Sequence, residues 1–244
     1  MKGWTDPPGY ISPRSGKRFD NLDLYEEFPI LDRASKLVDY MSYPNGQALP
    51  VQDTWPNLKS LNPIPGSYIL PSAGIGRMSL GEDADVSQVY LQFVPKYGGH
   101  VHKEMLNLNL FAEGQELLPD LGYTLSLHRY FTTSTIGHNT VVVNSQDMDV
   151  NDVTLHGGNI EQFAQVDHLF QVMRASQSES YEVTEEYSRE PWYITYPDDP
   201  NKGYVLDLFR VKGGDRHEYT LNGEANYDSV FNTDLPLTDY GPYL

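Results

Sequence analysis

The chain has no cysteine and few basic side chains for its length. Zero cysteines among 244 residues exclude a disulfide framework and a thiolate metal site. Lys and Arg number 17 against 34 Asp and Glu, a formal net charge of -17. This balance argues against nucleic acid and against an anionic membrane surface as partners, because phosphate binding needs clustered Lys and Arg. No window approaches the ~18 consecutive apolar residues of a membrane-spanning helix, and residues 1–8 lack the apolar core of a signal peptide.

The first 66 residues differ in pattern from the rest. Apolar side chains at spacings of three and four predict a helical segment over residues 20–45, namely Tyr25, Phe28, Leu31, Ala34, Leu37 and Val38. A proline-rich connector follows, from Leu49 to Gly66. Residues 1–70 carry a net charge of only -1, whereas residues 71–178 and 179–244 carry -7 and -9. We therefore expect residues 1–66 to form a helical segment and connector, separate from a domain over residues 67–244.

From residue 67 onward the apolar period changes to two. Val89–Phe93 and Leu106–Leu110 alternate apolar and polar residues, and Thr140–Val143 and Tyr204–Val211 are richer in apolar residues. Shorter strand candidates are Gln165–Val166, Phe170–Val172, Tyr181–Val183 and Tyr193–Tyr196. Many short strands with turn residues and no helices between them are typical of an antiparallel β-sandwich. The predicted fold class is therefore mainly β.

Three histidines and one aspartate form a candidate site, in which two of the imidazoles and the carboxylate are candidate metal ligands. His100 and His102 would share one face of a strand. The predicted hairpin partner of Leu106–Leu110 is Glu116–Asp120, which brings Asp120 toward His102, and His138 precedes a buried strand. Two imidazoles, one carboxylate and a water suit Zn²⁺. The alternative is a set of strand-end histidines that form hydrogen bonds with the backbone and carboxylates.

Three blocks of the sequence resemble one known family in order and spacing. The first block runs from Gly99 to Tyr123 and contains GHVH and LNLNLFAEGQELLPDLGY. The second is STIGHNTVVVN at residues 134–144, and the third is YVLDLFRV at residues 204–211, followed by Gly213-Gly214 and His217-Glu218-Tyr219. Together they resemble the sheet domain of heparinase II/III-type polysaccharide lyases over residues 67–235.

The resemblance implies a helical (α/α) toroid followed by an antiparallel sheet domain, with the active site between them. His102, Asp120 and His138 resemble the family's zinc ligands, and His100 resembles the histidine that faces the substrate. Lys103-Glu104 departs from the pattern, since relatives often place an Asp shortly after the second histidine. The family's catalytic Tyr and its partner lie on toroid helices. We therefore expect the chain to be the C-terminal part of a lyase, with residues 1–66 as a remnant of the toroid that is otherwise missing.

The activity implied by the resemblance is β-elimination on a polysaccharide that contains uronic acid. Elimination needs a group that neutralises the uronate carboxylate, a base, and a proton donor for the leaving oxygen. His100 is a candidate base or donor, because imidazole titrates near neutrality. Arg129 and Tyr123 are close to the proposed ligands in sequence and are candidates for sugar contact; a surface Arg and a packed Tyr are the alternatives. The resemblance also implies a secreted or periplasmic protein.

Two other classes of function remain open. A non-catalytic carbohydrate-binding sandwich would use exposed aromatic rings, but Trp4, Trp55 and Trp192 are scattered along the sequence and the histidine blocks would stay unexplained. An interaction domain could bind calcium through the acidic loop Asp147–Asp152, which lacks the Gly and the closing Glu of an EF-hand. A solvated loop is the alternative for that segment.

Overall fold

The expected antiparallel sandwich is confirmed by a computed structural model, which describes residues 3–82, 85–93, 100–124, 127–150, 158–167, 169–224, 227–228, 230 and 232–238. One sheet has the order β1-β2-β3-β4-β5, with strands Tyr68–Leu70, Ile75–Leu80, Ser87–Gln92, Asn107–Ala112 and Gln115–Leu118. The other has the order β10-β9-β8-β7, with strands Asp199–Lys212, Glu186–Tyr196, Phe170–Ser176 and Asn159–Val166. A small third sheet pairs β6 (Val141–Val143) with β11 (His217–Tyr219), and every pairing is antiparallel.

The main hydrophobic core lies between the two large sheets. On β3, Val89 and Leu91 face this core and meet Met173 on β8 and Tyr187 on β9. The sequence pattern predicts a strand exposed on one side, but all six residues of β3 are buried. The alternate residue Tyr90 is covered as well, because the connector packs over that face of the sheet.

Residues 40–66, which include the connector, are attached to the five-stranded sheet by a second, smaller core and by one buried cation. Tyr43 and Leu49 pack with Tyr90 and with Phe111 on β4. The guanidinium of Arg77, fully buried on β2, donates hydrogen bonds to the carbonyl oxygens of residues 40, 42, 64 and 66. A buried guanidinium is tolerated where its donors find acceptors. The connector and the sheet therefore form one packed unit.

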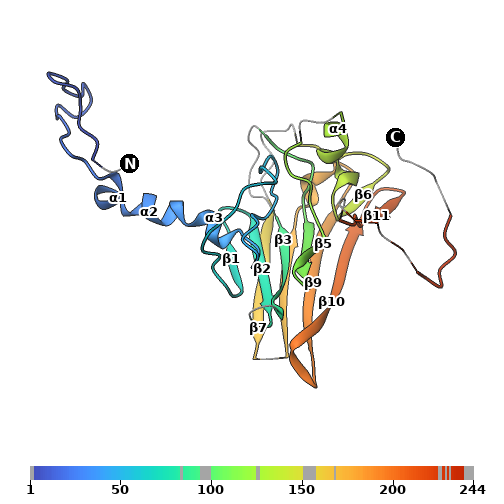
Figure 1. Cartoon of the computed structure of the whole chain (residues 1–244). Coiled ribbons are helices and arrows are strands. Elements are labelled where there is room, and N and C mark those ends of the chain that lie inside the picture. The colour runs from blue at the N-terminus through green and yellow to red at the C-terminus, as the bar shows by residue number, and fades with distance from the viewer. Residues whose placement is uncertain are drawn as a thin grey trace.

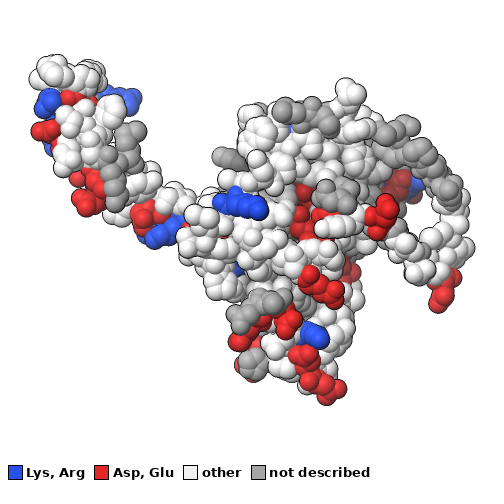
Figure 2. All heavy atoms as spheres, in the orientation of Figure 1, with Lys and Arg blue, Asp and Glu red and all other residues white. Residues whose placement is uncertain are grey.

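The N-terminal arm is helical, as expected, but it is divided into three short helices, α1 (Leu24–Glu27), α2 (Pro29–Ser35) and α3 (Leu37–Tyr40). Proline has no N–H to continue a helix, so α1 ends before Pro29, which is tolerated in the first turn of α2. No residue of these helices is buried, and the arm extends away from the sheets (Figure 1). In the space-filling view the arm carries charges of both signs, whereas carboxylates gather toward the lower end of the sandwich (Figure 2).

One strand prediction is wrong. Tyr181–Val183 follows the short 3-10 helix η3 (Ser178–Ser180) and forms a turn, in which the amide of Thr184 donates to the carbonyl oxygen of Tyr181. None of the described helices is long and apolar enough to cross a membrane.

Candidate metal centre and the adjoining hollow

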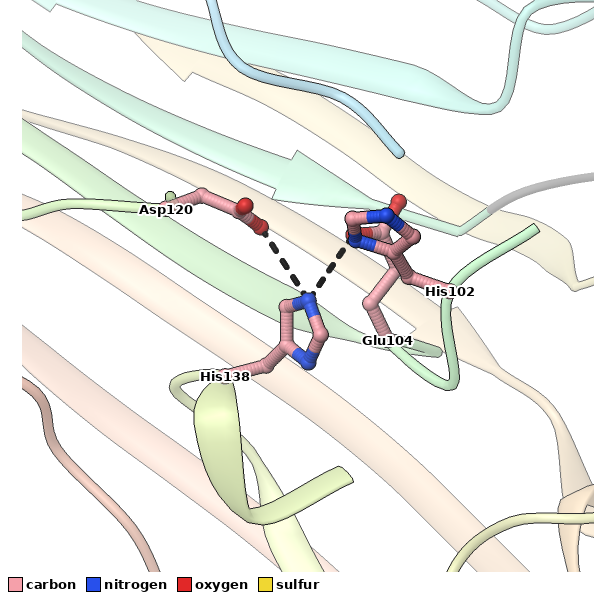
Figure 3. A group of neighbouring side chains, drawn as sticks. All are labelled: His102, Glu104, Asp120 and His138. Carbon is pink, nitrogen blue, oxygen red and sulfur yellow. Dashed lines mark ion pairs between the residues drawn. The ribbon is translucent and has the colours of Figure 1, made fainter. Parts of the chain in front are cut away.

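Four buried side chains meet at one end of the sandwich: His102, Glu104, Asp120 and His138. His102 and Glu104 precede β4, Asp120 follows β5, and His138 follows the short 3-10 helix η2 (Thr135–Gly137). The β4–β5 hairpin returns the chain so that Asn107 Nδ2 donates to Asp120 Oδ2 at 2.9 Å. Figure 3 shows the four side chains pointing toward one another from these separate segments.

The separations between their polar atoms suit a small cation. His138 Nε2 lies 3.2 Å from Glu104 Oε2 and 3.5 Å from Asp120 Oδ2. His102 Nδ1 lies 3.8 Å from Glu104 Oε2, and one ligand atom from each residue lies within 4.8 Å of the others. Tetrahedral zinc with bonds of about 2.1 Å has ligand atoms about 3.4 Å apart. The four atoms therefore need only small shifts to surround such an ion.

The hydrogen bonds around the cluster leave lone pairs directed into it. His138 Nδ1 donates to the carbonyl oxygen of Ser134 at 2.7 Å, and Glu104 Oε1 accepts from the amide of Gln52 at 3.0 Å. Among the described residues, His102 Nδ1, Glu104 Oε2 and His138 Nε2 have no hydrogen-bond partner although they are buried. Buried unpaired acceptors are costly, and a metal ion would satisfy all three. The donor set of two imidazoles and two carboxylates fits zinc.

The carboxylates and imidazoles perturb one another strongly. Burial lowers the pKa of His138, but Asp120 and Glu104 outweigh it and raise that pKa to about 9. The pKa of Asp120 is raised to about 7, chiefly by burial; the charge of His138 opposes this rise and that of Glu104 adds to it. The pKa of His102 is lowered, mainly by burial. The cluster therefore favours an additional positive charge at its centre.

Sequence reasoning placed three of these four residues in one site and missed the fourth. His102, Asp120 and His138 lie together as expected, and Glu104 joins them from the position noted as a departure from the family pattern. The expectation that His100 and His102 share a strand face is wrong, because the segment from residue 100 to residue 106 forms no strand. His100 adopts a φ of +71° and is exposed, whereas His102 is fully buried.

Asp53, which no sequence motif indicated, connects His100 to the cluster. Its Oδ2 lies 2.7 Å from His100 Nδ1, and its Oδ1 lies 3.0 Å from His102 Nε2 and 2.7 Å from Arg129 Nη2. Burial raises the pKa of Asp53, but the hydrogen bonds from Arg129, His102 and His100 lower it below its usual value. Arg129, on α4 (Arg129–Thr132), also lies 4.5 Å from the ring centre of Tyr123. The structure therefore brings together His100, Arg129 and Tyr123.

An open hollow of about 440 Å³ adjoins this carboxylate and is lined by Val51, Gln52, Asp53, Thr54, Trp55, His100 and Tyr123. The rings of Trp55 and Tyr123 are 4.6 Å apart, and Trp55 is 55 % exposed. Scattered tryptophans argued against a sugar-binding surface, but the fold places Trp55 beside a predicted sugar-contact residue. Exposed aromatic faces next to polar groups are suited to carbohydrate.

In the acidic loop that was a candidate for calcium binding, both carboxylate oxygens of Asp147 already accept hydrogen bonds from protein groups. Asp147 Oδ2 accepts from Lys103 Nζ at 2.6 Å, and its Oδ1 accepts from the amide of Thr135 at 2.8 Å. Asn151 and Asp152 lie outside the described residues. Among the residues that the structure describes, the one group of three or more His, Asp or Glu side chains close enough to hold a metal ion contains His102 and His138.

Comparisons with known proteins give a family from the sequence and a fold from solved structures. Residues 67–199 match the family described as heparinase II/III-like, C-terminal. The heparan sulfate lyase HepC from Pedobacter heparinus superposes with a TM-score of 0.61 at 17 % identity, covering 79 % of this chain and 34 % of that one. A heparinase III superposes with a TM-score of 0.63 at 15 % identity, covering 88 % and 39 %. The chain thus spans little more than a third of these structures, and at such identity the likeness shows the fold alone. No curated protein matches the sequence.

Proposed function

Because the chain belongs to the heparinase II/III-like C-terminal family, we propose that it is the sheet domain of a polysaccharide lyase. The proposed reaction is β-elimination on a polysaccharide that contains uronic acid, completed by a helical toroid that precedes the sheet domain. One observation supports this most directly: among the described residues, three buried ligand atoms of His102, Glu104 and His138 have no hydrogen-bond partner, and Asp53 connects this cluster to the exposed His100. A secreted or periplasmic location follows from the same family relation.

The proposed zinc ligands are His102, Asp120 and His138, with Glu104 as the fourth. A bound zinc would supply positive charge and cross-link the segments before β4, after β5 and after η2. Elimination consumes no water, so the ion is not required to activate one. Hydrogen bonds from Asn107 Nδ2 to Asp120 and from His138 Nδ1 to the carbonyl oxygen of Ser134 hold these ligands in orientation.

His100 is the proposed base. Because the carboxylate of Asp53 accepts a hydrogen bond from Nδ1–H, Nε2 of the neutral ring carries the lone pair and is the nitrogen that accepts the C5 proton of the uronate. The electron pair of that C–H bond forms the double bond between C4 and C5, and the glycosidic C4–O bond breaks. The proton donor for the leaving oxygen belongs, by the resemblance, to the toroid. Tyr123, Arg129 and Trp55 are the proposed sugar contacts.

The charge of the domain bears on the substrate class. The net charge of -17 opposes a dense polyanion, and Arg129 is already paired with Asp53. We therefore expect a less highly charged uronate polymer than heparin, such as one like alginate.

Zinc binding by the purified chain tests the metal site. After chelation and dialysis, calorimetric titration should give one zinc per chain, with a rise in Tm. The variants His102→Ala and His138→Ala should lose both, whereas the exposed His217→Ala should keep both. Absence of zinc binding in the parent chain, with unchanged stability of the two variants, would remove the metal site.

Activity requires a separate measurement. The absorbance of unsaturated uronate should stay flat when this chain is mixed with alginate, ulvan or heparin, and should rise once the natural upstream sequence is restored. The second candidate function, a non-catalytic carbohydrate-binding module, is favoured by the Trp55–Tyr123 pair. A restored protein that binds these polymers without producing unsaturated ends would support that candidate and exclude the lyase.

A further inference from the structure

Asp53 contacts two histidines that face different parts of the site. Its side chain is only 8 % exposed. Oδ2 meets Nδ1 of His100 at 2.7 Å, and Oδ1 meets Nε2 of His102 at 3.0 Å. An ionised carboxylate can only accept hydrogen bonds, so each of these ring nitrogens carries the proton. One carboxylate therefore holds opposite tautomers in the two rings.

We propose that Asp53 is a positioning residue that fixes these two tautomers, and thereby serves the metal site and the base together. In His102 the proton on Nε2 leaves Nδ1 as an acceptor, and this atom is the one that faces Glu104 Oε2 without a hydrogen-bond partner. In His100 the proton on Nδ1 leaves Nε2 as the basic nitrogen, on a ring that is 80 % exposed and lines the hollow. The catalytic part of this inference rests on the proposed function; the tautomers do not.

The connector holds Asp53 in place from both sides. The amide of Gln52 donates to Glu104 Oε1 at 3.0 Å, and the carbonyl oxygen of Thr54 accepts from the amide of Tyr123 at 2.9 Å. Gln52 has a φ of +51° and His100 a φ of +71°, a region that side chains with a Cβ rarely adopt. Strained backbone of this kind persists where surrounding contacts determine it and is common at functional sites.

Arg129 completes the arrangement by ordering the shared oxygen. Its Nη2 donates to Asp53 Oδ1 at 2.7 Å, the same atom that accepts from His102. Of the residues that the structure describes, His100 is therefore the one that Oδ2 contacts. Because Oδ1 binds His102 and Oδ2 binds His100, a substitution that changes only the second oxygen should alter the tautomer of His100 and leave that of His102 unchanged.

The variant Asp53→Asn keeps one oxygen acceptor and replaces the other with an NH2 donor. The amide oxygen can still accept from Arg129 and His102, whereas the amide nitrogen now donates to His100 Nδ1, which must give up its proton to Nε2. Asp53→Ala removes both contacts. The exposed Asp32→Asn, on α2, is the matched control.

Nitrogen-15 spectra of the histidine-labelled chain at alkaline pH give a direct measurement. In the parent chain His100 should be protonated at Nδ1 and His102 at Nε2, with assignments from His100→Gln and His102→Gln. Asp53→Asn should switch His100 alone. Zinc affinity should change by less than about threefold in Asp53→Asn and should fall ~10–100-fold in Asp53→Ala, as for other residues that orient a metal ligand. Unaltered spectra in Asp53→Asn would overturn the proposal, and this variant decides the question even if Asp53→Ala does not fold.

Kinetics of the protein with its upstream sequence restored provide a second readout. Asp53→Asn should lower kcat ~100-fold or more, the usual contribution of a general base, with KM within about threefold of the parent value. Adding His100→Gln to Asp53→Asn should cause no further loss, which a merely structural role would not predict. If the parent chain binds no zinc or the restored protein has no lyase activity, the proposed function fails, while the nitrogen spectra still test the tautomers.

Discussion

Glu116 is a buried carboxyl on β5, and replacing it with glutamine should stabilise the protein increasingly as the pH rises. Its residue exposure is 7 %, and its Oε2 accepts from Gln47 Nε2 at 2.9 Å. Burial raises the pKa of Glu116 from 4.5 to about 7; the Tyr43 hydroxyl and Gln47 lower it, while Glu224 and Asp120 raise it.

The sign follows from proton linkage. Because the folded state holds the proton more tightly than the unfolded state, ionisation of Glu116 opposes folding. This cost is nearly absent below pH 4.5, grows as the pH rises from 4.5 to about 7, and stays constant above that. The shift in pKa corresponds to roughly 3 kcal/mol at ~1.4 kcal/mol per unit. Glutamine keeps an acceptor for Gln47 without the charge.

Urea denaturation with chelator present, followed by tryptophan fluorescence, measures the effect. Glu116→Gln should exceed the parent protein in free energy of unfolding by roughly 1 kcal/mol near pH 5 and roughly 3 kcal/mol near pH 8. The control is Glu113→Gln, an exposed carboxyl in the same hairpin, which should show no such trend. A difference between the Glu116 variant and the parent that is constant with pH would refute the reasoning.

Two further substitutions test how the site is supported. Arg189→Met should cost about 3–5 kcal/mol of unfolding free energy, because the buried guanidinium pairs with a carboxylate and binds two carbonyl oxygens behind the ligand segments; the partly exposed Arg210→Met should cost less than about 1 kcal/mol in the same urea titration. Gly122→Ala should cost about 3 kcal/mol, because φ is +54° and a Cβ would lie 2.5 Å from the carbonyl oxygen of Thr54. Gly114→Ala, with a φ of +79° and open space around the new Cβ, should cost only about 1 kcal/mol of unfolding free energy. Equal decreases of Tm in the two variants would contradict the predicted clash between residue 122 and the carbonyl oxygen of Thr54.

Much of the fold could be predicted from local patterns. The alternation in Leu106–Leu110 and the turn residues Glu113 and Gly114 define the β4–β5 hairpin, and its register carries Asp120 to the start of β4. The hairpin and its register are set by residues close together in the sequence, so local patterns are enough to predict them. The burial of both faces of β3 could not be predicted, because its outer face is covered by residues about 40–50 positions earlier in the chain.

Part of the site could likewise be predicted from the sequence, and part could not. Glu104 is two positions from His102, but the period of two that grouped His100 with His102 does not explain its place in the site, because residues 100–106 form no strand. Asp53 has no local signal, since its partners lie 47, 49 and 76 positions away. Only the path of the connector across the sheet brings them together.

The way the connector joins the sandwich affects how the protein can be divided. A boundary at residue 66 follows the change in sequence pattern, and a version that begins at residue 67 would contain all four candidate ligands. It would lack the peptide N–H that binds Glu104 and the carboxylate shared by two histidines. Such a truncated chain would expose Tyr90 and the buried cation on β2 to solvent. The smallest portion of the chain that keeps all the contacts of the site therefore begins before the proline-rich segment. Sheet domains exchanged between relatives should carry that segment with them.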